Sequence, residues 1–452
     1  MRARVTQANG GSGQYKTIGG SANYNVIATT TASANDPTID SYGIAIYDHN
    51  GDAVTSFTSG HGLLRSLYVN NSVTLSTSTH TDVSTGLTGI STSNCVILIE
   101  GTGATGAAVS PQAACTFVGS NPVSVRIARV KSAQTVKITV AQYSGATIGA
   151  TEAHGFQLSN GNGDGVVDEN STCYAVREII NLNPASNGQQ LFQNAETNFL
   201  YVDLVQGRYP SSGGVPIPCI SSSKSVLMIP PTLSLTRHTD GSFKQVICYI
   251  PKSGTIAGNY KLAMLVSSDN ADPEYFGGTE PDYGIEIYKS NGDLAWHSGW
   301  RQAILNNVIS ANQFTVGTNQ NGNYDVTTGR DGVTAPVITD NVTPYGMESN
   351  GQVKDITGLN EMDPSKTYIA GPAVTGSVHY YMGEWENFEE DTSGYQGGGQ
   401  HKPAIKLTGF NTAKITMYRY SQGHTPPTED DAATRHPDSY HPEGHFLIFR
   451  IV

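Results

Sequence analysis

An acidic stretch with aromatic residues, EWENFEEDTSGYQGGG at positions 384–399, carries side chains suited to ligand binding. Aromatic rings stack on the apolar faces of sugars, while carboxylates accept hydrogen bonds from sugar hydroxyls. The same pattern fits a loop anchored to a neighbouring subunit, because interfaces are enriched in aromatic side chains. The interface is slightly favoured over the glycan site. The residues concerned are Glu384, Trp385, Glu386, Phe388 and Tyr395.

Two carboxylates in that stretch, Glu384 and Glu386, also raise the question of glycoside hydrolysis, which uses a carboxylate pair. A local run of acids, however, usually forms a solvated face. The sequence contains no Gly-x-Ser-x-Gly elbow, zincin histidine pair or phosphate-binding loop. Its Ser, His and Asp residues are scattered rather than arranged as a triad. We therefore expect no catalytic residues and a protein that is not an enzyme.

The segment NGNGDGVVDENS, at positions 160–171, resembles a calcium-binding loop of the EF-hand or dockerin type. Such loops place oxygen ligands at positions one, three, five, seven and nine, with a bidentate Glu at twelve. Here position one is Asn and position twelve is Ser171. A Gly/Asn-rich interdomain linker is therefore the favoured interpretation; no cofactor is expected, with weak calcium binding as the alternative. The candidate ligands are Asn160, Asn162, Asp164, Val166 and Asp168.

A second metal candidate lies near the C-terminus, where His436, His441 and His445 have a spacing compatible with zinc or iron if the loop folds back. The surrounding prolines and acidic residues instead describe an exposed loop before a final strand. The exposed loop is the favoured interpretation.

A repeated segment of the sequence best indicates the strands that would hold these loops. YGIAIYDHNGD from Tyr42 returns as YGIEIYKSNGD from Tyr283, with eight of eleven positions identical. In the first copy Ile44 and Ile46 alternate with other residues, as expected of a half-buried strand. The Asn-Gly that follows is a strong hairpin signal. Each copy therefore predicts a β-hairpin.

The repeat extends beyond this phrase, because KITVAQYS at 137–144 parallels KITMYRYS at 414–421 and AHGFQL faintly echoes EGHFLIF. Short strands separated by Gly, Asn and Pro turns favour an antiparallel sandwich. We predict an all-β protein with two related antiparallel β-sandwich domains and a small β-rich middle region. The predicted intervals are 1–160 for the first copy, 161–244 for the middle region or linker, and 245–452 for the second copy with expanded loops.

Composition narrows the function classes. Charged residues make up only 14% of the chain and the net charge is −12, which argues against nucleic-acid binding. No stretch approaches the roughly 18 apolar residues of a membrane helix. The N-terminal segment lacks the apolar core of a signal peptide. The five cysteines, an odd number without metal-ligand spacing, are expected to be buried free thiols.

The segment YGIEIYKSNGDLAWHSGWR, at 283–301, resembles the opening module of small virion proteins from the tail-tip and tail-fibre regions of tailed bacteriophages. In that module a Tyr-Gly-aliphatic strand leads to an Asn/Ser-Gly turn, an apolar strand, a Ser and then an Arg. The resemblance implies a virion structural protein with a β-sandwich fold. The family carries no catalytic residues that could be transferred to this chain.

The expected function is therefore that of a non-enzymatic structural protein of a tailed-phage virion, in the tail tip, fibre or adhesion apparatus. Expected partners are other virion proteins, further copies of the chain, and a glycan or protein receptor on the host surface. Neither nucleic acid nor membrane insertion is expected, and the location is the virion assembled in the host cytoplasm. The alternatives are a tail-associated glycan depolymerase or peptidoglycan hydrolase, a secreted calcium-dependent lectin, and a head-fibre or capsid-decoration protein.

Overall fold

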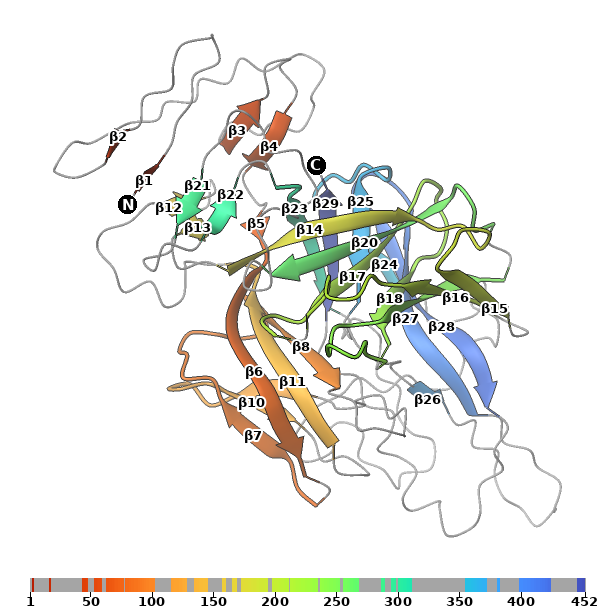
Figure 1. Ribbon diagram of the computed structural model, residues 1–452, viewed down its shortest axis with the longest axis horizontal. Coiled ribbons are helices and arrows are strands. Elements are labelled where there is room, and N and C mark those ends of the chain that lie inside the picture. Colours follow the sequence, from red (N-terminus) through yellow and green to blue (C-terminus); the bar gives the residue numbers. More distant parts are fainter. Residues whose placement is uncertain are drawn as a thin grey trace.

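The computed structural model is all-β, as predicted: every regular element among the described residues is a strand (Figure 1). Strands β1 (Arg2–Ala3) and β2 (Lys16–Thr17) pair with each other. The described residues are 2–3, 16–17, 43–47, 53–58, 62–76, 78–101, 115–127, 134–144, 157–159, 165–168, 172–193, 197–210, 212–234, 236–252, 255–267, 286–288, 294–297, 300–310, 354–371, 380–382, 398–423 and 445–451.

The first unit of the fold contains six strands. They are β6 (Arg65–Leu75), β7 (Thr81–Ser84), β8 (Cys95–Gly101), β9 (Cys115–Val118), β10 (Ser124–Ile127) and β11 (Gln134–Gln142). One sheet has the order β6-β11-β8 and the other has the order β7-β10-β9. Apolar residues from both sheets, including Ile97, Val125 and Ile138, form one buried cluster. The two sheets therefore pack face to face.

The second unit occupies the middle of the chain. Its strands are β14 (Thr172–Asn181), β15 (Gln189–Gln193), β16 (Thr197–Asp203), β17 (Ile217–Ser222), β18 (Ile229–Leu233), β19 (Gln245–Pro251) and β20 (Tyr260–Ser267). The sheets are β14-β20-β17 and β15-β16-β19-β18. The segment CYAVREIINL, at 173–182, lies almost entirely in β14.

The third unit closes the chain. Its strands are β23 (Ala303–Ser310), β24 (Lys354–Ile356), β25 (Thr367–Ala370), β26 (Tyr380–Met382), β27 (Gly398–Leu407), β28 (Ala413–Gly423) and β29 (His445–Ile451). The four-stranded sheet is β24-β28-β27-β26. The strands β23-β29-β25 belong, with β14-β20-β17 and β6-β11-β8, to one ten-stranded sheet, in which β25 pairs with β17 at Ile369 and Ile220.

All three units share one winding. Apart from β15 and β26, which each extend a sheet, every unit has six strands. The first, sixth and third strands of a unit form one sheet, and the second, fifth and fourth form the other. This is the order of a jelly roll without its innermost pair of strands. The predicted antiparallel sandwich class is confirmed. The predicted β-rich middle region begins a further unit of the same winding, the second, which β19 and β20 complete.

The shared winding corrects one sequence alignment. The segment KITV lies in β11, the sixth strand of the first unit, whereas KITM lies in β28, the fifth strand of the third unit. The position equivalent to β11 is β29, so these two similar segments are not structural counterparts. In addition, β19 and β20 fall after residue 245 but complete the sheets of the second unit.

A β-hairpin precedes each unit. The three hairpins are β3 (Gly43–Tyr47) with β4 (Ala53–Thr58), β12 (Gln157–Ser159) with β13 (Gly165–Asp168), and β21 (Glu286–Tyr288) with β22 (Leu294–His297). The first and third confirm the predicted hairpins. All three have the same register and an irregularity at the same place, with Ile46 opposite Thr55, Leu158 opposite Val167, and Ile287 opposite Trp296.

The first strand of each unit carries a bulge at an equivalent place. In the first unit this strand begins as β5 (Gly62–Leu63) and continues through Leu64 into β6. Pairing with the sixth strand of the same unit leaves one residue over each time: Leu67, Arg177 and Asn306. We call these three first strands the junction strands. Each bulge serves as a common reference position from which residues of the three strands are counted.

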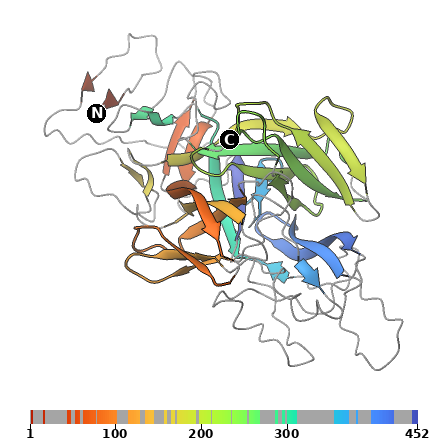
Figure 2. The same ribbon diagram turned by 60° about the horizontal axis from the view of Figure 1, so that its bottom comes forward.

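The junction strands pair with one another in a cycle. In each contact, the residues five and four positions before the bulge of one junction strand lie opposite the residues one and two positions before the bulge of another. The second unit meets the first through Thr172–Ser66 and Cys173–Arg65, and the first meets the third through Gly62–Leu305 and Leu63–Ile304. The third meets the second through Gln302–Ala175, and there the Val176 N–H donates to the Arg301 carbonyl at 3.0 Å. The second unit thus pairs with the first, the first with the third, and the third with the second. The three units therefore surround a pseudo-threefold axis (Figure 2).

Burial supports this arrangement. In β8, Ile97 and Ile99 face the core of the first unit, whereas Val96 and Leu98 belong to a larger cluster shared with the other two units. The sheet that contains each junction strand is thus apolar on both faces where it meets its neighbours. Met228, which directly precedes β18, also joins two units, because it pairs with Ile405 of β27.

Two prolines of the second unit, Pro230 and Pro231, lie within strand β18. This is an edge strand of its sheet, and its register with β19 shifts between Ile229 and Thr232. Because the prolines lie at this irregularity, the missing N–H groups cost no regular ladder hydrogen bonds.

The contact between the second and third units yields a stability prediction. A Cβ added to Gly371, which follows β25, would lie 2.5 Å from Cβ of Pro230. We expect Gly371→Ala to lower the free energy of unfolding by about 1–3 kcal/mol, because neither backbone can yield easily. Gly62→Ala is the control, since its Cβ would meet nothing nearer than the Tyr143 carbonyl at 3.9 Å. Urea denaturation that gives equal losses for the two variants would contradict the close packing.

Candidate functional site

The ligand-binding residues predicted from sequence lie almost entirely outside the described part of the chain. This holds for Glu384, Trp385, Glu386, Phe388 and Tyr395, for Asn160, Asn162 and Asp164, and for His436 and His441. Val166 and Asp168 lie in β13, and His445 is the first residue of β29, where it pairs with Ser310. The glycan, calcium and histidine-site hypotheses therefore remain predictions.

Strand pairing gives the Asn/Gly/Asp segment a second explanation. Asn162, Gly163 and Asp164 connect β12 to β13, in the position that Asn50, Gly51 and Asp52 take between β3 and β4. The repeated hairpin accounts for this composition without a bound ion. Among the described residues, no group of three or more His, Cys, Asp or Glu side chains is placed to hold a metal. The predicted buried free thiols are confirmed at all five cysteines.

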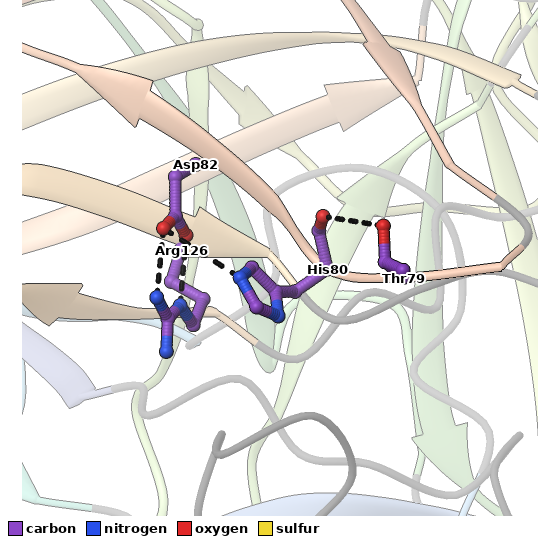
Figure 3. A network of polar contacts seen from close by, with 4 residues as sticks. All are labelled: Thr79, His80, Asp82 and Arg126. Atoms are coloured by element: carbon purple, nitrogen blue, oxygen red, sulfur yellow. Dashed lines mark hydrogen bonds and ion pairs between the residues drawn. The ribbon is translucent and has the colours of Figure 1, made fainter.

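One polar cluster lies on the outer sheet of the first unit (Figure 3). Asp82 of β7 faces Arg126 of β10, and the guanidinium donates from Nε and Nη2 to the two carboxylate oxygens at 2.8 and 2.7 Å. His80 Nε2 lies 3.7 Å from Asp82 Oδ2. The hydrogen bonds from Arg126 hold the pKa of Asp82 below its ordinary value. Asp82 remains partly exposed, so this cross-strand ion pair contributes little stability.

A second cluster is buried between the first and second units. Glu100 of β8 is 1% exposed and accepts a hydrogen bond from Nη2 of Arg237 in the second unit. The Arg237 guanidinium also lies 3.6 Å from the centre of the Phe243 ring. Burial raises the pKa of Glu100 to about 7, against the attraction of Arg237 and the buried Lys137. The Oε2 atom of Glu100 has no hydrogen-bond partner within the described structure.

A third cluster lies within the second unit. Glu178 follows the bulge of β14 and accepts hydrogen bonds from the Tyr209 hydroxyl and, at 2.6 Å, from Arg208 Nη1. Tyr209 is fully buried, and burial together with the charge of Glu178 raises its pKa well above the ordinary value. Tyr209 therefore stays protonated and acts as a donor that ties β14 to the segment after β16.

Each of the three clusters joins separate segments of the fold through a carboxylate and an arginine. In the first cluster the Thr79 hydroxyl donates to the backbone carbonyl of His80 at 3.3 Å and not to its ring (Figure 3). The thiols of Cys95 and Cys219 are buried, and burial raises the pKa of Cys95 to about 12 and that of Cys219 above its ordinary value. A protonated, inaccessible thiol is a poor nucleophile.

The exposed apolar surface points to a different kind of site. The exposed large apolar side chains of the described residues are Leu191, Phe192, Val205 and Phe410. Two of these are neighbours on β15. The Phe192 ring, 55% exposed, meets Tyr201 edge to face at 5.0 Å, and Phe199 meets Tyr249 at 5.7 Å. An aromatic row thus crosses the outer face of this sheet, from its free edge toward its buried interior.

Sequence reasoning missed this surface. The segment QQLFQ, at 189–193, has no charge and no motif, and only NFLYVDLVQG after it is recognised as a strand. Pairing of β15 with β16 and exposure of its side chains are what distinguish it. A useful signal in the sequence is an apolar pair between glutamines with no charged residue nearby.

No protein-family model, curated protein or solved structure matches this chain. Among the described residues, no helix is long and apolar enough to cross a membrane.

The buried carboxyl predicts a pH dependence. With a pKa near 7 in the folded protein and 4.5 as its ordinary value, Glu100 holds a proton in the folded state that the unfolded chain releases. Its contribution to stability therefore falls as pH rises from 4.5 to 7, by up to about 1.4 kcal/mol per pH unit. Glu100→Gln lacks this titration. The wild-type minus variant difference in unfolding free energy, measured by urea from pH 5 to 8, should fall to pH 7 and then level off. A difference that is constant or rises with pH would contradict the assignment.

Proposed function

We propose that this chain is a non-enzymatic structural protein of a tailed-phage virion, placed in the tail tip, fibre or adhesion apparatus. The observation that carries the proposal is the cyclic pairing of three equivalent units about a pseudo-threefold axis. Oligomers with closed symmetry place equivalent surfaces around an axis in the same way. One chain with an internal threefold arrangement is suited to a position where threefold symmetry is needed.

The repeated hairpin gives independent support. The module that resembles tail-tip and tail-fibre proteins is centred on this hairpin, and the same register occurs before each of the three units. A module used three times in one chain fits an architectural role better than a single catalytic centre. Under this proposal the partners are other virion proteins and a host-surface receptor, and the location is the virion.

The rigidity of the junction supports the same role. Strands from different units share backbone hydrogen bonds, such as Tyr174 N–H to the Leu64 carbonyl at 2.9 Å, and their side chains share one buried cluster. Units joined this way move as one rigid body, whereas domains connected only by linkers move relative to one another. A rigid block transmits force and orientation, which an attachment apparatus requires.

The test is the presence of the chain in particles. Density-gradient-purified, nuclease-treated phage particles should contain the protein by mass spectrometry, and antibodies raised against it should label the tail end in immunogold electron microscopy. Labelling of the head would support the head-fibre or decoration alternative instead. A chain confined to the soluble fraction, with no copies in intact particles, would overturn the proposal.

A separate experiment tests the alternative that the protein is a glycan depolymerase or peptidoglycan hydrolase. Purified host envelope polysaccharide and peptidoglycan should show no increase in reducing ends when incubated with the protein. An increase that disappears in the Glu384→Gln or Glu386→Gln variant would establish a depolymerase and contradict the structural role.

A further inference from the structure

Strand β15 presents an unprotected sheet edge. It is the outermost strand of β15-β16-β19-β18, and one of its two edges pairs with no described strand. Figure 1 shows β15 beyond β16 at the far right of the molecule. Residues 188–193 contain no charge and no proline, and Leu191 and Phe192 are exposed. A free, uncharged and apolar edge is a template for pairing with another chain.

Four other edges of the outer sheets, those of β7, β9, β18 and β24, are protected. At the opposite edge of the same sheet, β18 carries two prolines and is joined to β27 through Met228 and Ile405. The edge strands β7 and β24 carry Asp82 and Asp355, both in ion pairs. The uncharged edge strand β9 keeps Phe117 partly buried. Among the outer-sheet edge strands whose side-chain exposure is described, only β15 combines a missing charge with two exposed large apolar side chains.

The hydrogen-bond pattern defines which residues this edge offers. The Asp203 N–H donates to the Gly188 carbonyl at 2.7 Å, so that pair is of the hydrogen-bonded type. Pair types alternate along an antiparallel ladder, so Gln190 and Phe192 also bond to β16. Leu191 and Gln193 therefore point their N–H and carbonyl groups outward. Gln189 offers its carbonyl, because its N–H already donates to the Ser186 carbonyl at 3.2 Å.

These outward residues are related by a twofold centred on Leu191. A second β15 running antiparallel in that register places Leu191 opposite Leu191, and Gln189 opposite Gln193. All three pairs are of the hydrogen-bonded type, so the N–H groups of Leu191 and Gln193 on each edge donate to the Leu191 and Gln189 carbonyls of the other. Like side chains meet across the axis, and no charge has to be buried. A strand of unrelated sequence would satisfy the backbone equally but would lack this match.

We propose that a second copy of this chain pairs with β15 through a twofold centred on Leu191. The two four-stranded sheets join into one sheet of eight strands, and the aromatic rows around Phe192 lie on either side of the axis. Because a twofold contact uses the same patch on both partners, it closes after two copies and does not grow into a fibre. The proposal concerns self-association and does not depend on the virion function.

The first experiment measures oligomeric state. Size-exclusion chromatography with light scattering, over a hundredfold range of protein concentration, should give a dimer that dissociates on dilution. Leu191→Lys places like charges opposite each other on the axis and should weaken dimerisation at least tenfold. Phe410→Lys, at a site 66% exposed in the third unit, is the matched control and should dimerise like the wild type. A wild-type protein that stays monomeric, or a Leu191→Lys dimer of unchanged strength, overturns the proposal.

A cross-linking experiment tests the register and does not depend on the lysine variant folding. Residues in a hydrogen-bonded antiparallel pair have Cα atoms about 5.5 Å apart, which is within disulfide range. Since the five native cysteines are buried, mild oxidation should act on the introduced thiol. Leu191→Cys should give a covalent dimer on non-reducing gels, whereas Phe410→Cys should remain monomeric there. Equal cross-linking of the two variants, or none at Leu191→Cys, contradicts a twofold at this position.

Discussion

The fold depends on how the three junction strands satisfy their backbone hydrogen-bonding groups. Buried N–H and carbonyl groups must be paired, and a strand has two edges. One edge of each junction strand pairs with the sixth strand of its own unit. The other edge is divided at Leu64, Tyr174 and Ala303 between two neighbouring units. No unit can complete this pairing alone, so the structure requires all three together.

Packing follows from the same constraint. Once the junction strands meet, the sheets that contain them have both faces covered, one by the unit's own second sheet and one by the other units. Both faces can then be apolar, which explains why β17 is buried along its whole length. Buried polar groups at these contacts carry specific partners: Gln142 receives a hydrogen bond from Arg65 at 2.8 Å, and Gln302 bonds to Trp296 and Trp300. The differences among the three units therefore lie in their outer sheets.

Local patterns predicted the strands well, because alternation and Asn-Gly turns act over a few residues. The all-β class and the hairpins at 42 and 283 followed from them. The sequence did not predict the hairpin of β12 and β13, because His154-Gly155-Phe156 stands in place of Tyr-Gly-Ile and the Asn-Gly-Asp that follows resembles calcium ligands. The winding rests on pairings between strands far apart in the sequence, and every junction pair joins residues over a hundred positions apart. Such pairings leave no periodic signal. The free edge of β15 could not be predicted from the sequence for a related reason. It is defined by the absence of a pairing strand among the described strands, and local patterns do not report on pairing.

The most direct test of the cyclic junction is hydrogen exchange at its backbone amides, followed by mass spectrometry or nuclear magnetic resonance. The Tyr174 and Val176 amides donate across units, to Leu64 and Arg301. If the three units form one body, these amides should exchange as slowly as those in the centre of β20, through global unfolding alone. Exchange at Tyr174 and Val176 as fast as in surface turns, with β20 still protected, would show that the units separate and would contradict the pseudo-threefold architecture.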